Sequence, residues 1–136
     1  MSTRVIKFRG RVIEPKRPIL ATSAPVGSWV YGELHLNSLI PHIHHNRAGK
    51  SPIDPNTVGE ITGLQDKNGT DIYEGDIVKY GRNISQIVYQ CGMWILVDAD
   101  GTWCGIIEED SNVGICTKLD KFEVIGNIYD NPDLLK

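Results

Sequence analysis

The sequence lacks the features that mark disulfide-rich, membrane-spanning and nucleotide-dependent proteins. Its 136 residues include three cysteines, an odd number without a Cys-x-x-Cys pair, which favours a reduced, cytoplasmic setting. No stretch approaches the roughly 18 apolar residues of a membrane span. The charged N-terminus is not followed by the apolar run of a secretory signal. No glycine-rich phosphate loop occurs either, so we expect no cofactor. Because no long apolar stretch is present, we also expect no membrane partner.

Long helical patterns are missing as well, since no segment predicts a helix of three turns. Short runs in which apolar and polar residues alternate occur instead, separated by closely spaced turn residues. This pattern is typical of an all-β sandwich or barrel. The predicted strands are residues 4–9, 29–36, 39–45, 58–64, 71–73, 77–80, 83–90, 93–98, 102–107 and 122–129.

Prolines and turn residues predict where the chain leaves these strands. Residues 11–27 contain three prolines, which lack the N–H that a central strand needs, so we expect a loop or an edge there. Residues 46–56 are loop by composition and include a type I turn at Asp54-Pro55-Asn56. Pro132 is expected to start one helical turn. In the predicted strand 29–36 the aliphatic face, which we expect to line the core, consists of Val30, Gly32, Leu34 and Leu36.

The strongest turn signal in the chain is Asp-Lys-Asn-Gly, which begins at Asp66. A two-residue hairpin loop would set Asp66 directly opposite Asp71, and two like charges across a strand pair are destabilising. A type I turn with a left-handed Gly69 avoids this clash and pairs Leu64 with Ile72. We therefore expect the second, bulged register.

A tight bend follows this hairpin at Glu74-Gly75-Asp76. Gly75 suits a positive φ, and Asp76 can accept backbone N–H bonds beside the bend. Residues 57–80, which include this hairpin and bend, also hold Asp66, Asp71 and Glu74. Paired carboxylates can bind a cation or transfer protons. Turn chemistry already explains these acids, so we interpret them as structural.

Four blocks of the chain follow one another in a specific order: residues 6–9, 29–32, 54–78 and 124–132. In these blocks the chain resembles the YopX family of small proteins encoded by phages and prophages of Gram-positive bacteria. The resemblance implies a mainly β fold with a small, SH3-like barrel in the C-terminal half and a tendency to self-associate. It supplies no activity, and no catalytic residues can be carried over from it. The motif positions to which we assign structural roles are Gly63, Asp66, Asn68, Gly69, Gly75, Asp76, Gly126 and Asn127.

From the pattern and the resemblance together, we predict two parts in one compact chain. Residues 1–56 form a small N-terminal sheet with a proline-rich loop, and this sheet packs on the barrel. Residues 57–136 form the small barrel and a C-terminal tail. Long helices are few or absent.

The net charge of −3 is divided unevenly. The first 17 residues sum to +5, because six basic residues face Glu14 alone, and the remainder carries −8. Such a segment can bind phosphate or dock on an acidic surface of its own fold or of a sister subunit. The candidate nucleic-acid-binding residues are Arg4, Lys7, Arg9, Arg11, Lys16 and Arg17.

Other candidate groups have weaker patterns. All four histidines lie within residues 35–45, and His42 and His44 would share one strand face, so these two are the weak metal candidates beside His35 and His45. The cysteines lack the flanking motif of a nucleophile and suit core packing. Bases could stack on exposed aromatic side chains, the tryptophans being Trp29, Trp94 and Trp103.

These observations predict a non-enzymatic phage accessory protein of the bacterial cytoplasm. We expect it to act through contacts with a host or phage protein and to form homo-oligomers, because unpaired strand edges invite pairing between subunits. A nucleic-acid-binding module is the alternative. A metal-dependent enzyme built on the histidines is the least favoured of the three.

Overall fold

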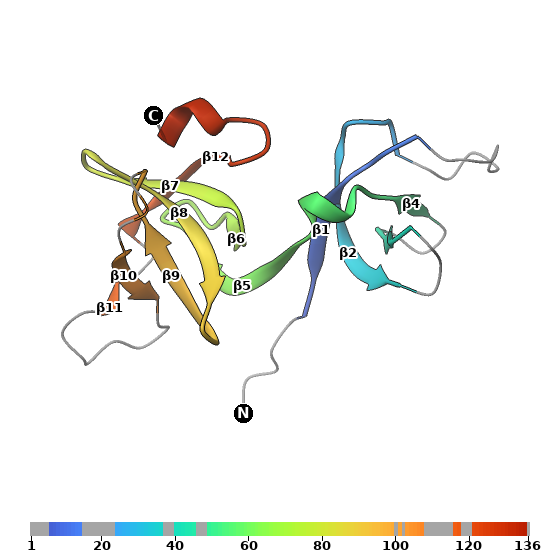
Figure 1. Ribbon diagram of the computed structural model, residues 1–136. Coiled ribbons are helices and arrows are strands. Elements are labelled where there is room, and N and C mark those ends of the chain that lie inside the picture. The colour runs from blue at the N-terminus through green and yellow to red at the C-terminus, as the bar shows by residue number, and fades with distance from the viewer. Residues whose placement is uncertain are drawn as a thin grey trace. The chain divides into compact units, whose positions relative to one another are not determined.

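The fold of this chain is mainly β, as the alternating pattern predicts. A computed structural model describes residues 6–14, 24–36, 40–45, 49–99, 101, 103–107, 116–117 and 121–135 (Figure 1). Within these ranges the helices are two short 3-10 turns, η1 (Pro55–Thr57) and η3 (Pro132–Leu135). Neither is long or apolar enough to cross a membrane.

The described residues form twelve strands, and the chain divides into two compact units, residues 1–61 and 62–136. The sequence placed the division after residue 56. The strands are β1 (Phe8–Arg11), β2 (Trp29–His35), β3 (His42–His44), β4 (Lys50–Pro52), β5 (Gly59–Gln65), β6 (Asp71–Tyr73), β7 (Asp76–Tyr80), β8 (Asn83–Gln90), β9 (Met93–Val97), β10 (Trp103–Ile107), β11 (Cys116–Thr117) and β12 (Glu123–Asn127).

The N-terminal unit is an antiparallel meander in which β1, β2, β3 and β4 follow one another in space. The meander curls, because a bridge between Val12 and Ile53 brings the chain beyond β1 against the chain beyond β4. Two backbone bonds hold this corner, from Ile13 N–H to the Pro52 carbonyl (3.0 Å) and from Asp54 N–H to the Arg11 carbonyl (2.9 Å). The curl encloses one face of the sheet and leaves the other outside.

The enclosed face follows directly from the alternation of the strands. A core cluster is formed by Val12, Val30, Ile43 and Ile53, with Phe8, Ala24, Leu34 and Val58 packed against it. Gly32 lies on this face, and its φ of 154° and its lack of a Cβ let the carbonyl oxygen of His44 approach closely. Leu36, which the pattern assigned to the same face, lies past the end of β2 and is 70% exposed, so that prediction was wrong.

The boundary between the units falls inside β5. Its first residues pair with β1, at Phe8↔Glu60 and Arg9↔Gly59, and the strand then adjoins β6. Between β5 and β6, Gly69 N–H donates to the Asp66 carbonyl and Asp66 N–H donates to the Thr70 carbonyl. Gly69 has a φ of 80°. These bonds agree with the bulged register that the sequence favours.

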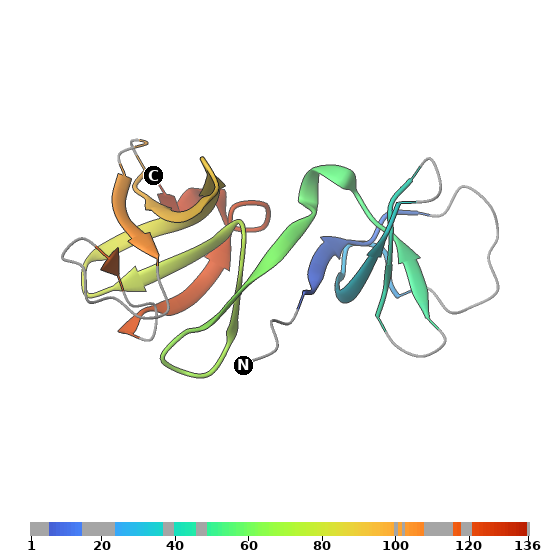
Figure 2. The ribbon, with the colours of Figure 1, turned by 90° about the horizontal axis from the view of Figure 1, so that it is seen from below.

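The C-terminal unit holds a sheet with the order β11-β10-β9-β8-β7-β12, in which β10 and β11 are parallel and the other pairs antiparallel. The sheet is strongly curved (Figure 2). Its core cluster consists of Ile72, Val78, Ile87, Leu96 and Phe122, with Leu64, Trp94 and Val124 packed against it. Burial of such apolar side chains is the main favourable contribution to the free energy of folding.

The bend at Gly75 connects several strands of this unit. Gly75 has a φ of 89°, its N–H donates to the Ile87 carbonyl, and its own carbonyl accepts from Ile128 N–H. The buried Asp76 carboxylate accepts the N–H of Tyr73 at 2.8 Å. The bend therefore fixes the chain between β8 and the end of β12.

Two further expectations need correction. The expected closed barrel is not formed by the described strands, because β11 pairs with β10, β12 pairs with β7, and no bonds join these two end strands to each other. Residues 50–52, expected to be loop, form β4; Pro52 is compatible with a strand there because β4 lies at the end of the sheet order, where a missing N–H is tolerated.

Candidate functional site

The outward face of the N-terminal unit gathers cationic and aromatic side chains on two adjacent strands. In the register of β1 with β2, Arg9 lies opposite Tyr31 and Arg11 lies opposite Trp29. Lys7 precedes Arg9 by two residues, and side chains two residues apart share a face. We call this set, Lys7, Arg9, Arg11, Trp29 and Tyr31, the cation–aromatic cluster (β1 and β2 in Figure 1).

The cations of the cluster lie over the rings. The guanidinium carbons of Arg9 and Arg11 are 4.9 Å and 5.3 Å from the centroid of Trp29. Lys7 Nζ is 6.0 Å from the centroid of Tyr31, at the outer limit of such a contact. A guanidinium that stacks on a ring keeps its N–H donors in its own plane, so stacking is compatible with donation to an anion.

Exposure divides the cluster into a contact layer and a support. Tyr31 is 43% exposed, whereas Arg9 is only 5% exposed. Lys7, Arg11 and Trp29 are half-buried. Arg9, a candidate from the sequence, therefore positions Trp29 from below, and an incoming ligand would meet Lys7, Arg11 and the two rings.

The remaining basic candidates, Arg4, Lys16 and Arg17, lie outside the described residues. The division of charge nevertheless matches the division of the fold. Residues 1–61 hold eight basic and four acidic side chains, a net charge of +4. Residues 62–136 hold six basic and thirteen acidic side chains, a net charge of −7. The cation–aromatic cluster thus belongs to the basic unit.

Three histidines continue the same outward face. Pairing of β2 with β3 sets His35 opposite His42 and Glu33 opposite His44, and pairing of β3 with β4 sets His44 opposite Lys50. The rings of His35 and His44 stack at 3.9 Å between centroids. His42 Nδ1 donates to the carbonyl of Ile40 at 2.8 Å. We call Glu33, His35, His42, His44 and Lys50 the histidine patch.

This arrangement does not provide a set of ligands for the metal site suggested by the sequence. His42 and His44 do share a face, as predicted, but no three His, Cys, Asp or Glu side chains within the described ranges are arranged to hold a metal ion. His45 lies outside the patch and is hydrogen-bonded through Nε2 to Ser51 Oγ at 2.9 Å. The histidines are better described as part of a surface than as a centre.

The motif residues with predicted structural roles lie in turns and strands of the C-terminal unit. Asp66 accepts backbone bonds from Asn68, Thr70 and Val124. Asn127 Oδ1 accepts from the N–H groups of Tyr129 and Asp130. A Cβ on Gly126 would lie 2.5 Å from Asn131 Oδ1. Gly63 has a φ of 85° within β5. Most of these contacts are local, whereas the bond from Val124 to Asp66 joins residues 58 positions apart in sequence.

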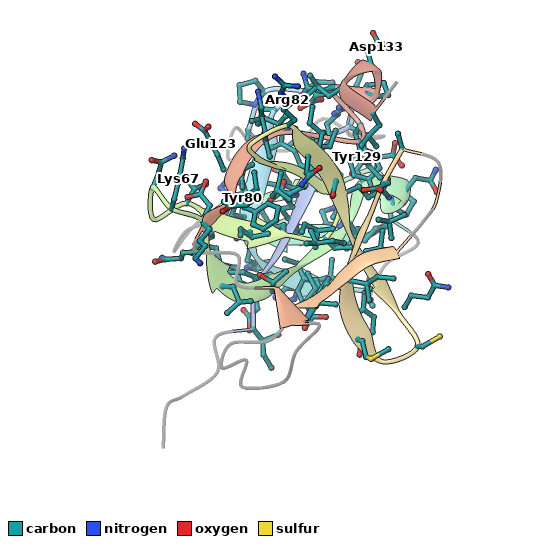
Figure 3. The ribbon with its side chains drawn as sticks, turned by 90° about the vertical axis from the view of Figure 1, so that its left-hand side faces the viewer. Lys67, Tyr80, Arg82, Glu123, Tyr129 and Asp133 are labelled. Carbon is teal, nitrogen blue, oxygen red and sulfur yellow. The ribbon has the colours of Figure 1, made fainter. Side chains whose placement is uncertain are left out.

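Aromatic side chains of the C-terminal unit are arranged differently. Trp94 packs against the core cluster and meets Tyr89 edge-on, and the ring of Tyr80 lies tilted against that of Phe122, at 5.3 Å between centroids. Lys67 Nζ and Glu123 Oε2 lie 3.7 Å apart, and both side chains are labelled in Figure 3. Cys91, expected in the core, is exposed in the turn between β8 and β9.

Sequence reasoning identified the cations and the rings separately but not their association. The β1–β2 register was hidden by the proline-rich connection, so Tyr31 gave no signal as the partner of Lys7. Glu33 and Lys50 were missed as neighbours of the histidines, because β4 looks like a loop in the sequence. The alternation of residues 29–35 was the one usable signal, since it placed Trp29, Tyr31, Glu33 and His35 on a single face.

Comparison with protein families gives one finding. The profile of the YopX protein family matches residues 28–136, which is most of the chain and includes β2 through η3. No curated protein matches the chain. The chain belongs to the YopX family.

Proposed function

We propose that this member of the YopX family is a non-enzymatic module that binds single-stranded nucleic acid on the cation–aromatic cluster of its N-terminal unit. The observation that supports the proposal is the register of β1 with β2, which brings Lys7 and Arg11 beside Trp29 and Tyr31 on one outward face. Single strands expose both of the groups that such a face recognises: phosphates for the cations and bases for the rings.

The chemistry of the cluster favours a single strand over a duplex. Bases of a duplex are stacked on one another, whereas an unpaired base can stack on Tyr31 or on the open part of Trp29. From Lys7 to Arg11 the strand runs about 13 Å, at roughly 3.3 Å per residue. This length spans about two nucleotides of an extended single strand, which matches the two cations and the two rings of the contact layer.

The charge of the units supports the same location. A polyanion is attracted to the unit with +4 and repelled by the unit with −7. The expected binding is therefore salt-sensitive, weak at physiological ionic strength, and confined to residues 1–61. Two cations in the contact layer predict a slope of log affinity against log salt of about −1.4, at about −0.7 per phosphate contact with a single strand.

Fluorescence anisotropy with a labelled oligothymidylate tests the proposal. Tyr31→Ala is expected to weaken binding about 5- to 150-fold, because stacking of one base contributes about 1–3 kcal/mol. Arg11→Gln is expected to reduce the salt slope by about 0.7. Two controls lie in the acidic unit: Tyr80→Ala, which matches Tyr31 in exposure, and Lys79→Gln, which removes an exposed cation. Wild-type protein that leaves the anisotropy unchanged at low salt, or controls that lose as much affinity as Tyr31→Ala, would contradict the proposal.

Self-association is the second candidate function, and the opposite charges of the two units favour it. The basic unit of one copy complements the acidic unit of another, and such head-to-tail contacts would be strongest at low salt. Light scattering after size exclusion is expected to show a mass that rises with concentration and falls with salt. A strict monomer over a wide concentration range would refute this candidate. Contact with a host or phage protein, in an accessory role during phage growth, is the wider context we propose for both functions.

A further inference from the structure

The histidine patch directly continues the cation–aromatic cluster along β2. Trp29, Tyr31, Glu33 and His35 follow one another at every second position of this strand, so they share its outward face. Successive side chains on that face are about 7 Å apart. A strand of nucleic acid that leaves Tyr31 along β2 therefore meets Glu33 and the stacked histidine rings next.

At neutral pH this continuation is unattractive to phosphate. Glu33 on β2 and Lys50 on β4 carry opposite charges on either side of His44, and Glu33 lies nearest to Tyr31 along the strand. Glu33 is 80% exposed, so its carboxylate faces solvent and any ligand there. The anion limits the binding face to the cluster itself.

Protonation changes this balance through contacts that already exist. His35 Nε2 lies 3.5 Å from Glu33 Oε2, and Nε2 has no hydrogen-bond partner among the described residues. A proton on His35 would complete an ion pair with Glu33 and neutralise the anion beside the cluster. Protons on His42 and His44 would add cations farther along the same face. Histidine is the side chain whose charge ordinarily changes between about pH 5 and 8.

We propose that the histidine patch is a pH-dependent extension of the nucleic-acid-binding face, which repels phosphate at neutral pH and binds it when His35, His42 and His44 gain protons. This inference rests on the proposed function of the cluster. It assigns the ligand class of the patch, a single-stranded polyanion, and the condition under which it binds.

The neighbours of His44 determine how the response is spread over pH. Loss of water around the stacked ring lowers the pKa of His44, and His35 on β2, Lys50 on β4 and His42 on the same strand lower it further, while Glu33 opposes them. His44 therefore gains its proton at a lower pH than an ordinary histidine. A bound phosphate would favour the protonated form, so binding and protonation strengthen one another.

The test measures binding of oligothymidylate at pH 7.5 and pH 5.5, with a label whose emission does not change in this range. Thymine does not titrate between these values, so a pH effect arises in the protein. Each added phosphate contact is worth roughly 5-fold at 0.1 M salt, from a slope of about 0.7. Wild-type affinity is expected to rise about 5- to 25-fold at pH 5.5, and the salt slope is expected to steepen.

Two variants separate the patch from general acid effects. The double variant His35→Gln, His44→Gln removes the titrating stack and is expected to lose most of the pH-dependent gain while it keeps the affinity at pH 7.5. His45→Gln is the matched control, because His45 contacts Ser51 rather than the patch. Circular dichroism at both pH values verifies that each variant is folded, and the single variant His42→Gln, with a smaller expected loss, replaces the double variant if that protein does not fold.

The outcomes distinguish the two proposals. A gain at pH 5.5 that is retained by His45→Gln and lost by the double variant supports the patch. Equal affinity at both pH values, or an equal gain in the double variant, refutes the patch and leaves the function of the cluster standing. Absence of binding at both pH values refutes both.

Discussion

Asp66 joins two distant parts of the C-terminal unit, and its removal should destabilise the protein measurably. One carboxylate oxygen, Oδ1, accepts the N–H groups of Asn68 at 2.8 Å and Thr70 at 2.9 Å inside the hairpin turn. The other, Oδ2, accepts the N–H of Val124 on β12 at 2.9 Å, 58 residues away in sequence. Asp66 is only 5% exposed, so water cannot readily replace it.

The expected loss can be estimated from these three bonds. Hydrogen bonds to a charged acceptor contribute about 1.5–3 kcal/mol each, and a buried donor left without a partner costs about 1–3 kcal/mol. Asn68 and Thr70 are exposed, so their N–H groups can turn to water, whereas Val124 is half-buried. We therefore expect Asp66→Ala to lower the free energy of unfolding by about 3 kcal/mol.

Asparagine at this position provides a sharper comparison. The side-chain oxygen of Asp66→Asn can still accept from Asn68 and Thr70, but its NH₂ group then faces the N–H of Val124. Two donors cannot bond to each other, so we expect a loss of about 2 kcal/mol despite the near-identical shape. Asp71→Asn is the matched control, because the bond that Asp71 accepts from Gln65 at 3.2 Å is exposed, and the loss should stay within about 0.5 kcal/mol.

The pH dependence of this difference follows from the charge of Asp66. Burial by itself raises the pKa of Asp66, but the N–H groups of Val124, Thr70 and Asn68, together with Lys67, lower the pKa below its ordinary value. The folded state therefore favours the ionised form. The stabilisation is fully present above the unfolded pKa of about 3.9 and is lost as pH falls through the lower folded value. Urea denaturation at pH 7, 5 and 3 should show the same difference between the wild type and Asp66→Asn at pH 7 and pH 5, and a smaller difference at pH 3. A constant difference down to pH 3, or an Asp66→Asn variant as stable as the wild type, would refute this reasoning.

Three further variants test other parts of the structure by urea denaturation or binding. Gly32→Ala should lower the free energy of unfolding by more than about 2 kcal/mol, because a Cβ at this position collides with the His44 carbonyl. Gly81 has a φ of 60° and open space around it, so Gly81→Ala should lower the free energy of unfolding by only about 1 kcal/mol. Equal losses in the two variants would contradict the contact at Gly32. Cys91→Asn should stabilise the protein by roughly 0.5–1 kcal/mol, since Cys91 has a φ of 55° in a two-residue turn that suits Asn-Gly, and an unchanged urea midpoint would argue against strain there. Glu33→Gln should tighten oligothymidylate binding several-fold at pH 7.5, and weaker binding would show that the carboxylate does not oppose the ligand.

Much of the fold was predictable, because apolar and polar residues alternate along many strands of this chain. The predicted strands 71–73 and 83–90 have the observed bounds, and those at 29–36 and 93–98 differ by one residue. The turn at Gly69 was predictable from charge, since one of two registers opposed Asp66 to Asp71. Such features depend on residues close together in sequence, which a single chain reveals.

Features that depend on distant pairing were not predictable. The sequence did not predict β4, because Pro52 argues against a strand. A proline is tolerated there only because β4 lies at the end of the sheet order, and that position depends on the tertiary structure. Closure of a barrel depends on pairing between strands far apart in sequence, and the described strands β11 and β12 do not pair with each other. In the N-terminal unit, the bridge of Val12 with Ile53 is also a distant pairing. The candidate site has the same limit: the basic residues and the aromatic residues were each recognisable, yet the proline-rich connection conceals the register that puts Arg11 over Trp29.

The most direct test of the central claim is a map of amide chemical shifts during titration with a short oligothymidylate at low salt. The account predicts that the largest changes occur on the outward positions of β1 and β2, at Lys7, Arg11, Trp29 and Tyr31, and that at pH 5.5 they extend to His35 and His44. Shifts confined to residues 62–136, or a spectrum unchanged by excess oligonucleotide, would contradict it.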